Sequence, residues 1–271
     1  MENVSVQDIV RATGGVLLSG NNDALLNKIR LDSRQVEAGD LFVPIIGEKV
    51  DAHRFLPQVA ENGAGAVLTS EQNAKTEEME KTSCAWIAVD DTKKALQAVG
   101  RYLRKRLTLP IVGVTGSVGK TSTKEMISSV LEQKYSVLKT AGNFNNEIGL
   151  PLTIFRIRDE HQVAVLEMGI SDFGEMHRLS AMSCPDIMVI TNIGYCHLEF
   201  LGDRDGVLRA KTECFEHMMP DASVVLNGDD DKLATKQTVN GKSVVFYGKG
   251  QSAESCGDNS QNDNGNKAYA A

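Results

Sequence analysis

Residues 111–123 read IVGVTGSVGKTST, and this stretch decides the predicted fold. An apolar run leads into a glycine-rich turn, which is followed by Lys120 and Thr121 at the start of a predicted helix. Glycines allow a tight turn whose backbone N–H groups converge, and the helix directs the positive end of its dipole to the same place. Lys120 would add a charge beside terminal phosphates, and the Thr121 hydroxyl would be a magnesium ligand. The stretch therefore predicts a phosphate-binding loop for ATP or a similar nucleotide.

The glycines are not spaced as in the common phosphate-binding loop, which has four residues between its two glycines. Five residues separate Gly113 from Gly119, and two separate Gly116 from Gly119. A glycine turn followed by a solvated lysine is the alternative interpretation. The apolar strand before the turn, the helix after it and the Gly-Lys-Thr sequence together favour a variant of the phosphate-binding loop.

The composition is that of a globular chain, with 41% hydrophobic and 24% charged residues, and 271 residues are enough for two domains. A net charge of −7 argues against a nucleic acid or an anionic membrane as a general partner. The five cysteines are odd in number and form no CxxC pair, which argues against a disulfide framework and a zinc site. No stretch approaches the roughly 18 apolar residues of a membrane span, and the amino terminus lacks a signal-peptide pattern. We expect a cytoplasmic protein without membrane insertion.

Strand and helix patterns alternate from Pro110 onward, which predicts an α/β fold with a mostly parallel sheet. Predicted strands are 111–114, 136–139, 163–167, 186–191, 223–226 and 243–247, and predicted helices are 121–133, 173–182 and 205–218. Earlier segments predict a small mixed α/β unit, with strands at 28–31, 40–46, 65–69 and 85–89 and helices at 54–61 and 93–107. A capping pair of Ser5 and Asp8, followed by Gly14, predicts a further short helix.

The helix predicted at 93–107 has four basic residues toward its end, which are Arg101, Arg104, Lys105 and Arg106. Cations are favourable there because they interact with the negative end of the helix dipole. We therefore expect a solvated basic helix end rather than an anion site. We also expect this helix to connect two domains.

Polar residues follow two predicted strands at the edge where parallel sheets bind ligands. Glu167 ends the strand VAVLE, and Asn192 and His197 follow the strand at 186–191. A carboxylate and an imidazole beside a phosphate loop could supply part of the coordination of Mg²⁺. The end of a buried strand favours a metal-binding role for Glu167, whereas His197 alone would more often be a loop histidine. Chemistry alone assigns no role to the other histidines, which are His53, His161, His177 and His217.

Polar residues also gather early in the chain, in DSR at 32–34, GDLFV at 39–43 and GEKVDAHRF at 47–55. Polar residues at strand edges are usually turn formers, although loops also carry binding residues. The residues alone leave a turn and a binding role equally open.

Several motifs in order resemble the Mur ligase family. They are TGSVGKTSTKEM at 115–126, GNFNNEIGLPLT at 142–153, LEMG at 166–169, TNIGYCHLEFLG at 191–202 and AKTE at 210–213. The early DSR, GDLFV and DAHRF segments are similar to the nucleotide-precursor domain of that family, with Ala52 where glycine is usual. The resemblance covers about residues 28 to 250 and accounts for the variant loop, because that family uses Thr-Gly-Ser/Thr-x-Gly-Lys-Thr/Ser.

The resemblance implies a role for each matching position. The residues implied to bind ATP are Thr115, Gly116, Ser117, Val118, Gly119, Lys120, Thr121 and Asn146. The residues implied to hold Mg²⁺ are Thr121, Glu167 and His197. The residues implied to face the UDP-sugar substrate are Ser33, Arg34, Asp51, His53, Asn143 and Asn145, although asparagines also occur simply as turn formers.

Lys211 in AKTE matches a lysine that is carbamylated in the family, and the resemblance makes it a catalytic residue with Lys120, Glu167 and His197. Carbamylation would convert a cation with a reference pKa of about 10.4 into an anion able to bind a second Mg²⁺. The alternative is an ordinary helix lysine beside Glu213.

The implied activity is an ATP-dependent ligation in peptidoglycan synthesis that joins D-alanyl-D-alanine to UDP-N-acetylmuramoyl-tripeptide through an acyl phosphate. Such a reaction depends on positioning and charge rather than on a protein nucleophile, and the sequence suggests no Ser-His-Asp or Cys-His arrangement. A binding module without catalysis, and another phosphate-loop enzyme such as a folylpolyglutamate synthase or a nucleotide hydrolase, are the alternatives.

The domain organisation expected from these patterns has three parts. Residues 1–107 would bind the UDP-precursor, residues 108–250 would form an ATP-binding domain, and residues 251–271 would be a polar, disordered tail. Members of the family continue through more of the ATPase sheet and a third domain, neither of which appears in this sequence. We therefore expect the ATP-binding domain to be incomplete.

Overall fold

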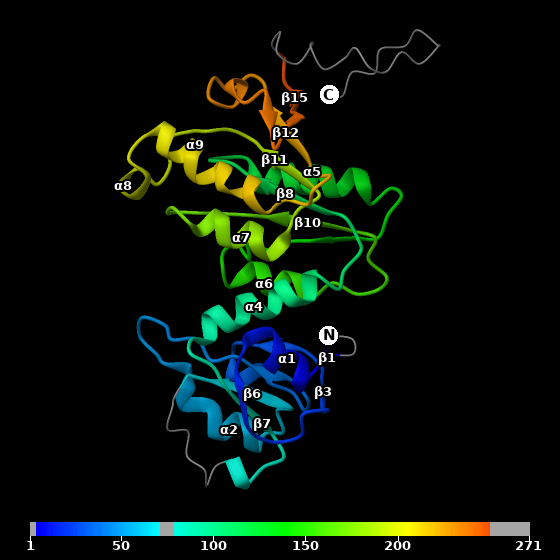
Figure 1. Cartoon of the computed structure of the whole chain (residues 1–271), viewed down its shortest axis with the longest axis vertical. Coiled ribbons are helices and arrows are strands. Elements are labelled where there is room, and N and C mark those ends of the chain that lie inside the picture. Colours follow the sequence, from blue (N-terminus) through cyan, green and yellow to red (C-terminus); the bar gives the residue numbers. More distant parts are fainter. Residues whose placement is uncertain (1–3, 71–78, 250–271) are drawn as a thin grey trace.

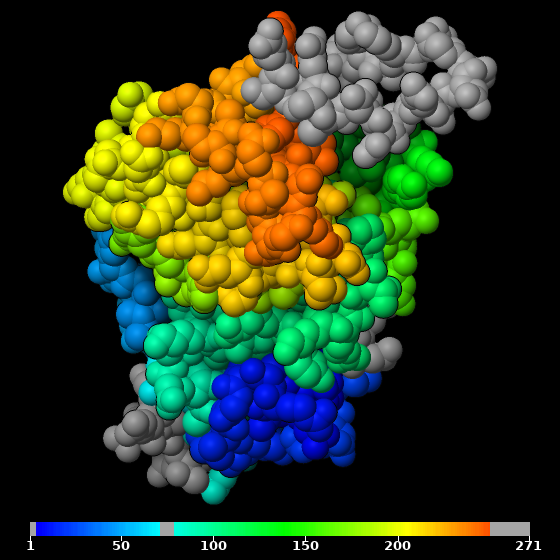
Figure 2. Space-filling model, turned by 45° about the horizontal axis from the view of Figure 1, so that its top comes forward, coloured from blue at the N-terminus to red at the C-terminus, as the bar shows by residue number. Residues whose placement is uncertain are grey.

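The computed structural model describes residues 4–70 and 79–249. Two sheets lie at opposite ends of an elongated molecule, and helix α4 (Thr92–Arg104) lies between them (Figure 1). On the surface, the turquoise and green segment around α4 lies between the dark blue start of the chain and the yellow and orange part, while a lighter blue stretch reaches the yellow part at the left (Figure 2). This arrangement confirms the predicted α/β class with a small mixed unit followed by a mostly parallel sheet.

The amino-terminal unit is built on a five-stranded mixed sheet with the order β2-β7-β6-β5-β4. Its strands are β2 (Val16–Ser19), β4 (Ile29–Arg30), β5 (Leu41–Phe42), β6 (Ala66–Thr69) and β7 (Ala85–Ala88). Only β2 runs antiparallel to its neighbour, while the other pairs are parallel. Two short strands, β1 (Val4–Ser5) and β3 (Leu25–Leu26), pair separately.

The helices of this unit begin and end where their capping residues predict. Helix α1 (Val6–Thr13) starts with a complete capping box between Ser5 and Asp8 and ends at Gly14, whose φ is +67°. The short helices are η1 (Ser33–Gln35), η2 (Ala52–Phe55) and α2 (Leu56–Glu61). The helix predicted at 54–61 therefore begins two residues earlier, as the 3-10 helix η2, and continues as the α-helix α2.

Helix α4 joins the two cores. Leu96 and Val99 are buried in the amino-terminal core, whereas Leu103 packs against both cores. A Cβ atom on Gly100 would lie 3.1 Å from the Cβ of Pro151, so a small residue at this position allows the close approach of α6 (Gly149–Ile154). The connecting role predicted for this helix therefore includes packing on both sides.

The expectation of a solvated basic end of α4 is wrong for Arg104, whose side chain is buried. Its guanidinium donates hydrogen bonds to the carbonyls of Ser183 (2.7 Å) and Cys184 (3.0 Å) and to Asp186 (3.0 Å). The last carbonyls of a helix have no partner within it, and Arg104 supplies the donors for the end of α7 (Glu175–Ser183).

The central sheet has six parallel strands in the order β15-β12-β11-β8-β10-β9. They are β8 (Ile111–Thr115), β9 (Val137–Lys139), β10 (Val163–Glu167), β11 (Ile187–Ile190), β12 (Ser223–Asn227) and β15 (Val245–Tyr247). A short hairpin of β13 (Thr238–Val239) and β14 (Lys242–Ser243) precedes β15, with η4 (Leu233–Thr235) before it. All six strands lie where the apolar runs predicted them.

The two faces of this sheet have separate cores because successive side chains of a strand alternate. Val112 and Val114 pack toward α5 (Lys120–Leu131), whereas Ile111 and Leu166 pack on the opposite face with α6, α7 and α9 (Arg204–Thr212). The helix predicted at 205–218 is divided into α9 and η3 (Glu213–His217), and α8 (Leu198–Leu201) was not predicted.

Within the described residues, no helix is long and apolar enough to cross a membrane. The tail predicted at 251–271 lies outside the described residues.

Candidate active site

The loop between β8 and α5 has the backbone that its glycines predict. Gly116 has a φ of +149°, and a Cβ atom there would lie 1.9 Å from Oγ1 of Thr191. Gly119 has a φ of +80° and immediately precedes α5. Glycine is therefore required at residue 116 both by the backbone conformation and by the space available.

Two N–H groups of this loop are held by the segment after β11. The backbone carbonyl of Asn192 accepts from Ser117 N–H at 3.1 Å, and its side-chain oxygen accepts from Val118 N–H at 3.1 Å. The N-terminus of α5 has no capping hydrogen bond from a side chain within the described part of the chain. The N–H groups of its first turn are thus the donors that the fold presents to an anion.

The loop side chains point in different directions. Thr115 is buried and donates to the carbonyl of Met168 (2.8 Å), and the Ser117 hydroxyl accepts from Gly194 N–H (2.8 Å). Lys120 folds back and donates to the carbonyls of Gly116 (2.9 Å) and Ser117 (3.3 Å), although it also lines the adjoining cavity. Of these side chains, Lys120 is the one whose charge is available to a ligand in that cavity.

Glu167 is the centre of the predicted metal site. It is buried at the end of β10 and accepts hydrogen bonds from the Thr121 hydroxyl (2.9 Å) and from the Asn145 amide (2.8 Å). The ammonium of Lys124, which is also buried, lies 3.9 Å from the same carboxylate. A hydroxyl and a carboxylate in contact at a phosphate loop offer the oxygen ligands that Mg²⁺ prefers, so these residues fit a magnesium site.

His197 lines the cavity beside the phosphate loop, whereas Thr121 and Glu167 are not among the residues that line it. The backbone of His197 is in the left-handed region with a φ of +52°, and its exposed side chain lines the same cavity as Lys120. The residues that the structure describes provide no hydrogen-bond partner for its ring. The imidazole is therefore free to bind a ligand within the cavity.

Lys211 has the environment least suited to a charged amine. Its side chain is almost fully buried on α9, and among the described residues its ammonium has no hydrogen bond or ion pair. The pKa of Lys211 is lowered to about 8, mainly by burial; the charge of Lys120 also lowers it, whereas Cys196 and Cys214 oppose the change. A pKa of 8 leaves about one amine in ten uncharged at pH 7, far more than for an ordinary lysine.

The cavity beside the loop has a volume of about 390 Å³ and is formed by α4, the segment before α6, and the start of α7. Its lining includes Lys93, Lys120, Asn145, Asn146, Glu175 and His197. The side-chain oxygen of Asn146 accepts from the N–H groups of Ile148 (3.1 Å) and Gly149 (2.9 Å), so it also fixes the start of α6. Asn143 is exposed and is not part of this lining.

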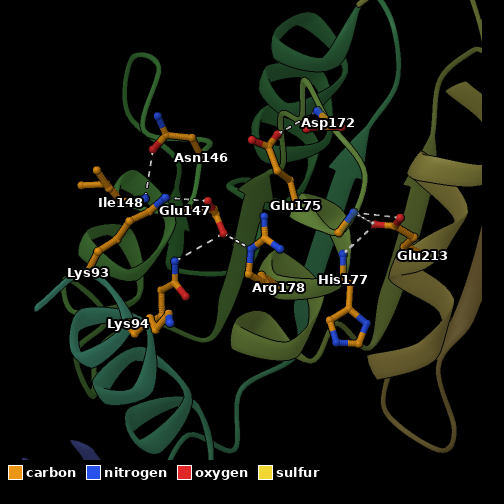
Figure 3. Close-up of polar contacts among 12 residues, drawn as sticks. Lys93, Lys94, Asn146, Glu147, Ile148, Asp172, Glu175, His177, Arg178 and Glu213 are labelled. Atoms are coloured by element: carbon orange, nitrogen blue, oxygen red, sulfur yellow. Dashed lines mark hydrogen bonds and ion pairs between the residues drawn. The ribbon is translucent and has the colours of Figure 1, made fainter. Parts of the chain in front are cut away.

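Sequence reasoning missed Glu147, which is buried and lines the cavity. Its carboxylate accepts from Lys93 of α4 (2.8 Å) and from Arg178 of α7, so it links the two units (Figure 3). Burial raises the pKa of Glu147, but the hydrogen bonds from these two cations outweigh it and leave the pKa below its ordinary value. The only sequence signal was a single acidic residue between NFNN and an apolar helix.

A second cavity, of about 710 Å³, lies on the amino-terminal unit and contains two of the four residues predicted there to face the UDP-sugar. Ser33 and Arg34 line it together with Phe55. Arg34 pairs with Asp32 (2.7 Å), and the hydrogen bonds from Arg34 lower the pKa of Asp32 to about 2. The structure thus brings Ser33 and Arg34 to one cavity.

Asp51 and His53 do not line that cavity. Asp51 accepts from the N–H and from Nδ1 of His53 (2.9 and 2.7 Å), and Nε2 of His53 contacts the hydroxyl of Ser70 (3.0 Å). We expected no Ser-His-Asp arrangement, but Ser70, His53 and Asp51 are connected by hydrogen bonds in this order. His53 is buried, however, and the backbone N–H of Ser70 also donates to its Nε2 (3.2 Å), so the ring fastens two segments together.

Comparison with known protein families shows which family this chain belongs to. The Mur ligase middle domain matches residues 114–269, and the Mur ligase family catalytic domain matches residues 26–103. The chain belongs to the Mur ligase family. The resemblance noted in the sequence is thereby confirmed.

The chain is similar to curated UDP-N-acetylmuramoyl-tripeptide–D-alanyl-D-alanine ligases of this family. It is 39% identical to the Bacillus subtilis protein over 247 residues, which cover 91% of the chain and 52% of the relative. Identity to the Synechocystis protein is 38% over 248 residues, which cover 90% of the chain and 54% of the relative. The chain thus spans about half the length of the curated relatives it matches.

Solved structures of MurF have the same fold. One from Acinetobacter baumannii has a TM-score of 0.83 and 34% identity, over 92% of this chain and 54% of that chain. Another, from Thermotoga maritima in complex with ADP, has a TM-score of 0.74 and 32% identity, over 83% of this chain and 51% of that chain.

Proposed function

We propose that the chain is the part of a D-alanyl-D-alanine-adding Mur ligase that binds MgATP and the UDP-precursor. The observation that carries this proposal is the contact between Thr121 and Glu167 beside a loop that requires glycine at residue 116, in a chain of the Mur ligase family. We further propose that residues 1–107 bind the precursor and residues 108–250 bind ATP. The curated relatives at 39% and 38% identity are named for this ligation.

The proposed reaction has two steps. The terminal carboxylate of UDP-N-acetylmuramoyl-tripeptide attacks the γ-phosphorus of ATP, which gives an acyl phosphate and ADP. The amine of D-alanyl-D-alanine then attacks the acyl carbon, so that an amide forms and phosphate leaves. Two anions must meet in the first step, and positive charge in the site is therefore the main requirement.

Residues in and beside this cavity would meet that requirement. The first turn of α5 and Lys120 would hold phosphate oxygens, and Thr121, Glu167 and His197 would hold Mg²⁺. When bound, Mg²⁺ would draw negative charge away from the phosphate oxygens. Asn145, which donates to Glu167, would keep that carboxylate oriented.

We propose that Lys211 is carbamylated and binds a second Mg²⁺. Its burial without an acceptor supports this role, because an unpaired ammonium is costly to bury whereas an uncharged amine is not. The uncharged amine is also the form that reacts with carbon dioxide. The lowered pKa of Lys211 supplies this form near neutral pH.

The UDP-precursor would bind along the amino-terminal unit. The cavity containing Ser33 and Arg34 adjoins another of about 460 Å³, since Leu31 and Asp32 line both. That second cavity reaches Phe144, which lies between Asn143 and Asn145, and Arg156, which follows α6. A nucleotide-linked sugar bound on the first unit would thus extend toward the ATP cavity.

The test measures MgATP and precursor binding before turnover. The full chain should retain ATP in equilibrium dialysis with Mg²⁺, and Lys120→Ala should lose it while the exposed control Lys134→Ala retains it. Phosphate release that depends on UDP-N-acetylmuramoyl-tripeptide and D-alanyl-D-alanine would support ligation. Precursor binding without turnover would favour the binding module, and ATP hydrolysis indifferent to the precursor would favour a nucleotide hydrolase. Failure to bind MgATP under any precursor condition would refute the proposal.

A further inference from the structure

A second group of ligating side chains lies outside the ATP cavity. Nδ1 of His177 is 2.8 Å from a carboxylate oxygen of Glu216 and 3.3 Å from Nε2 of His217. One ligand atom from each residue lies within 4.8 Å of the other two. The imidazole of His177 points away from Glu175, which lines the ATP cavity (Figure 3).

The elements that carry these residues are held together independently of any ion. His177 is on α7, and Glu216 and His217 are on η3. The carboxylate of Glu213 accepts from the N–H groups of Gly174 (2.9 Å) and His177 (3.2 Å), which fastens η3 to the start of α7. The fold therefore brings the three side chains together. The two imidazole rings meet edge to face, with an angle of 80° between the ring planes, so an imidazole would have to turn for both nitrogens to face one ion.

We propose that His177, Glu216 and His217 bind one divalent transition-metal ion, for which Zn²⁺ is the best candidate. Zn–N distances of 2.0–2.1 Å place two ligands of a tetrahedral site about 3.3 Å apart. The separation between Nδ1 of His177 and Nε2 of His217, 3.3 Å, matches that value, and one ligand atom of Glu216 lies within 4.8 Å of both histidine nitrogens. The half-exposed position leaves the fourth site to water.

The chemistry of these ligands separates this site from the magnesium site. Two imidazoles and one carboxylate suit Zn²⁺, Cu²⁺ or Ni²⁺, whereas Mg²⁺ prefers oxygen ligands. Burial lowers the pKa of His217, and the neighbouring His177 lowers it further.

The experiment titrates the full chain with Zn²⁺ against a chromophoric chelator in the presence of excess Mg²⁺. The wild type should bind one Zn²⁺ ion, and His177→Ala and His217→Ala should each weaken binding by at least about 100-fold, since even the loss of a supporting partner costs 10–100-fold. His161→Ala removes a histidine elsewhere and should bind as the wild type does. Glu216→Gln, which preserves the size of the side chain, should also weaken binding.

Two outcomes would overturn the proposal: the wild type binds no Zn²⁺, or His177→Ala and His217→Ala bind Zn²⁺ as tightly as the wild type does. Loss of binding in His197→Ala would assign the ion to the ATP cavity instead and would equally refute the site. Circular dichroism shows whether each variant is folded. If an alanine variant is unfolded, the Zn²⁺ affinity of Glu216→Gln tests the proposal in its place.

Discussion

Replacing Glu147 with glutamine should destabilise the folded chain by separating the two units. The carboxylate is buried and accepts from Lys93, Arg178 and Gln97, whereas glutamine retains one acceptor oxygen and no charge. Removal of one partner of a fully buried ion pair costs about 3–5 kcal/mol. The side chains of Lys93 and Arg178 are 45% and 44% exposed, so both cations can be solvated after the change. We therefore expect the free energy of unfolding to fall by about 2 kcal/mol. This value lies between the cost of breaking a buried ion pair and the cost of breaking a surface ion pair.

The assay is thermal and urea unfolding of Glu147→Gln, Lys93→Met and the double variant. A loss of about 2 kcal/mol should lower the Tm by about 4–8 °C for a chain of this size. The effects of the two single variants should add to more than the effect of the double variant, because both break the same pair. Unfolding of Glu147→Gln indistinguishable from wild type, or strict additivity, would refute the claim that this carboxylate holds α4 against α7.

The same carboxylate should make stability depend on pH in one direction. The folded-state pKa of Glu147 is below its ordinary value of 4.5, so the folded state binds the proton less readily than the unfolded state does. The stabilisation is therefore complete above the unfolded pKa and is lost as the pH falls through the folded pKa. Below about pH 4.5, the difference in stability between wild type and Glu147→Gln should shrink.

Three further substitutions test other parts of the site. Gly116→Ala should abolish MgATP retention in equilibrium dialysis, because its Cβ would lie 1.9 Å from Thr191, whereas Gly202→Ala, with a φ of +79° and no atom within 4 Å, should retain binding. Arg104→Met should lower the free energy of unfolding by about 2–4 kcal/mol in urea titrations, because buried acceptors lose a charged donor. On the proposed function, Lys211→Ala should lose precursor-dependent phosphate release, short carboxylates should restore it, and absence of recovery would count against carbamylation.

The central sheet could be predicted because its strands are short apolar runs that are buried on both faces. The runs at 111–115 and 163–167 are fully buried. The first leads into the glycine-rich loop, and the second ends in the charged residue Glu167. Strand β2 escaped prediction because it is an edge strand with Val16 and Leu18 exposed, so its pattern has no clear apolar face. Its pairing with β7 depends on a segment about 70 residues further along.

The predicted site residues were those whose role follows from local sequence. Thr121 and Glu167 meet because a phosphate loop and the end of the adjacent parallel strand are neighbours in such sheets. Lys124, Glu147 and Arg104 could not be found in this way. Each is buried by a contact with a distant segment, as in the bond of Lys124 to the carbonyl of Thr140 (2.8 Å), and only the assembled fold distinguishes them from solvated charges.

The charges around the cavity indicate why the proposed ATP site would depend on a bound cation. Its lining carries Lys93 and Lys120 but also Glu147 and Glu175, so these four side chains have no net charge when all are ionised. Lys93 is already paired with Glu147, and the nearby Glu167 adds a further negative charge. Within this lining, Lys120 offers positive charge to a triphosphate, whereas the charge of Lys93 is engaged by Glu147. A divalent ion held between Thr121 and Glu167 would supply further attraction at the point where the phosphate loop ends, since the attraction between charges strengthens as water is excluded.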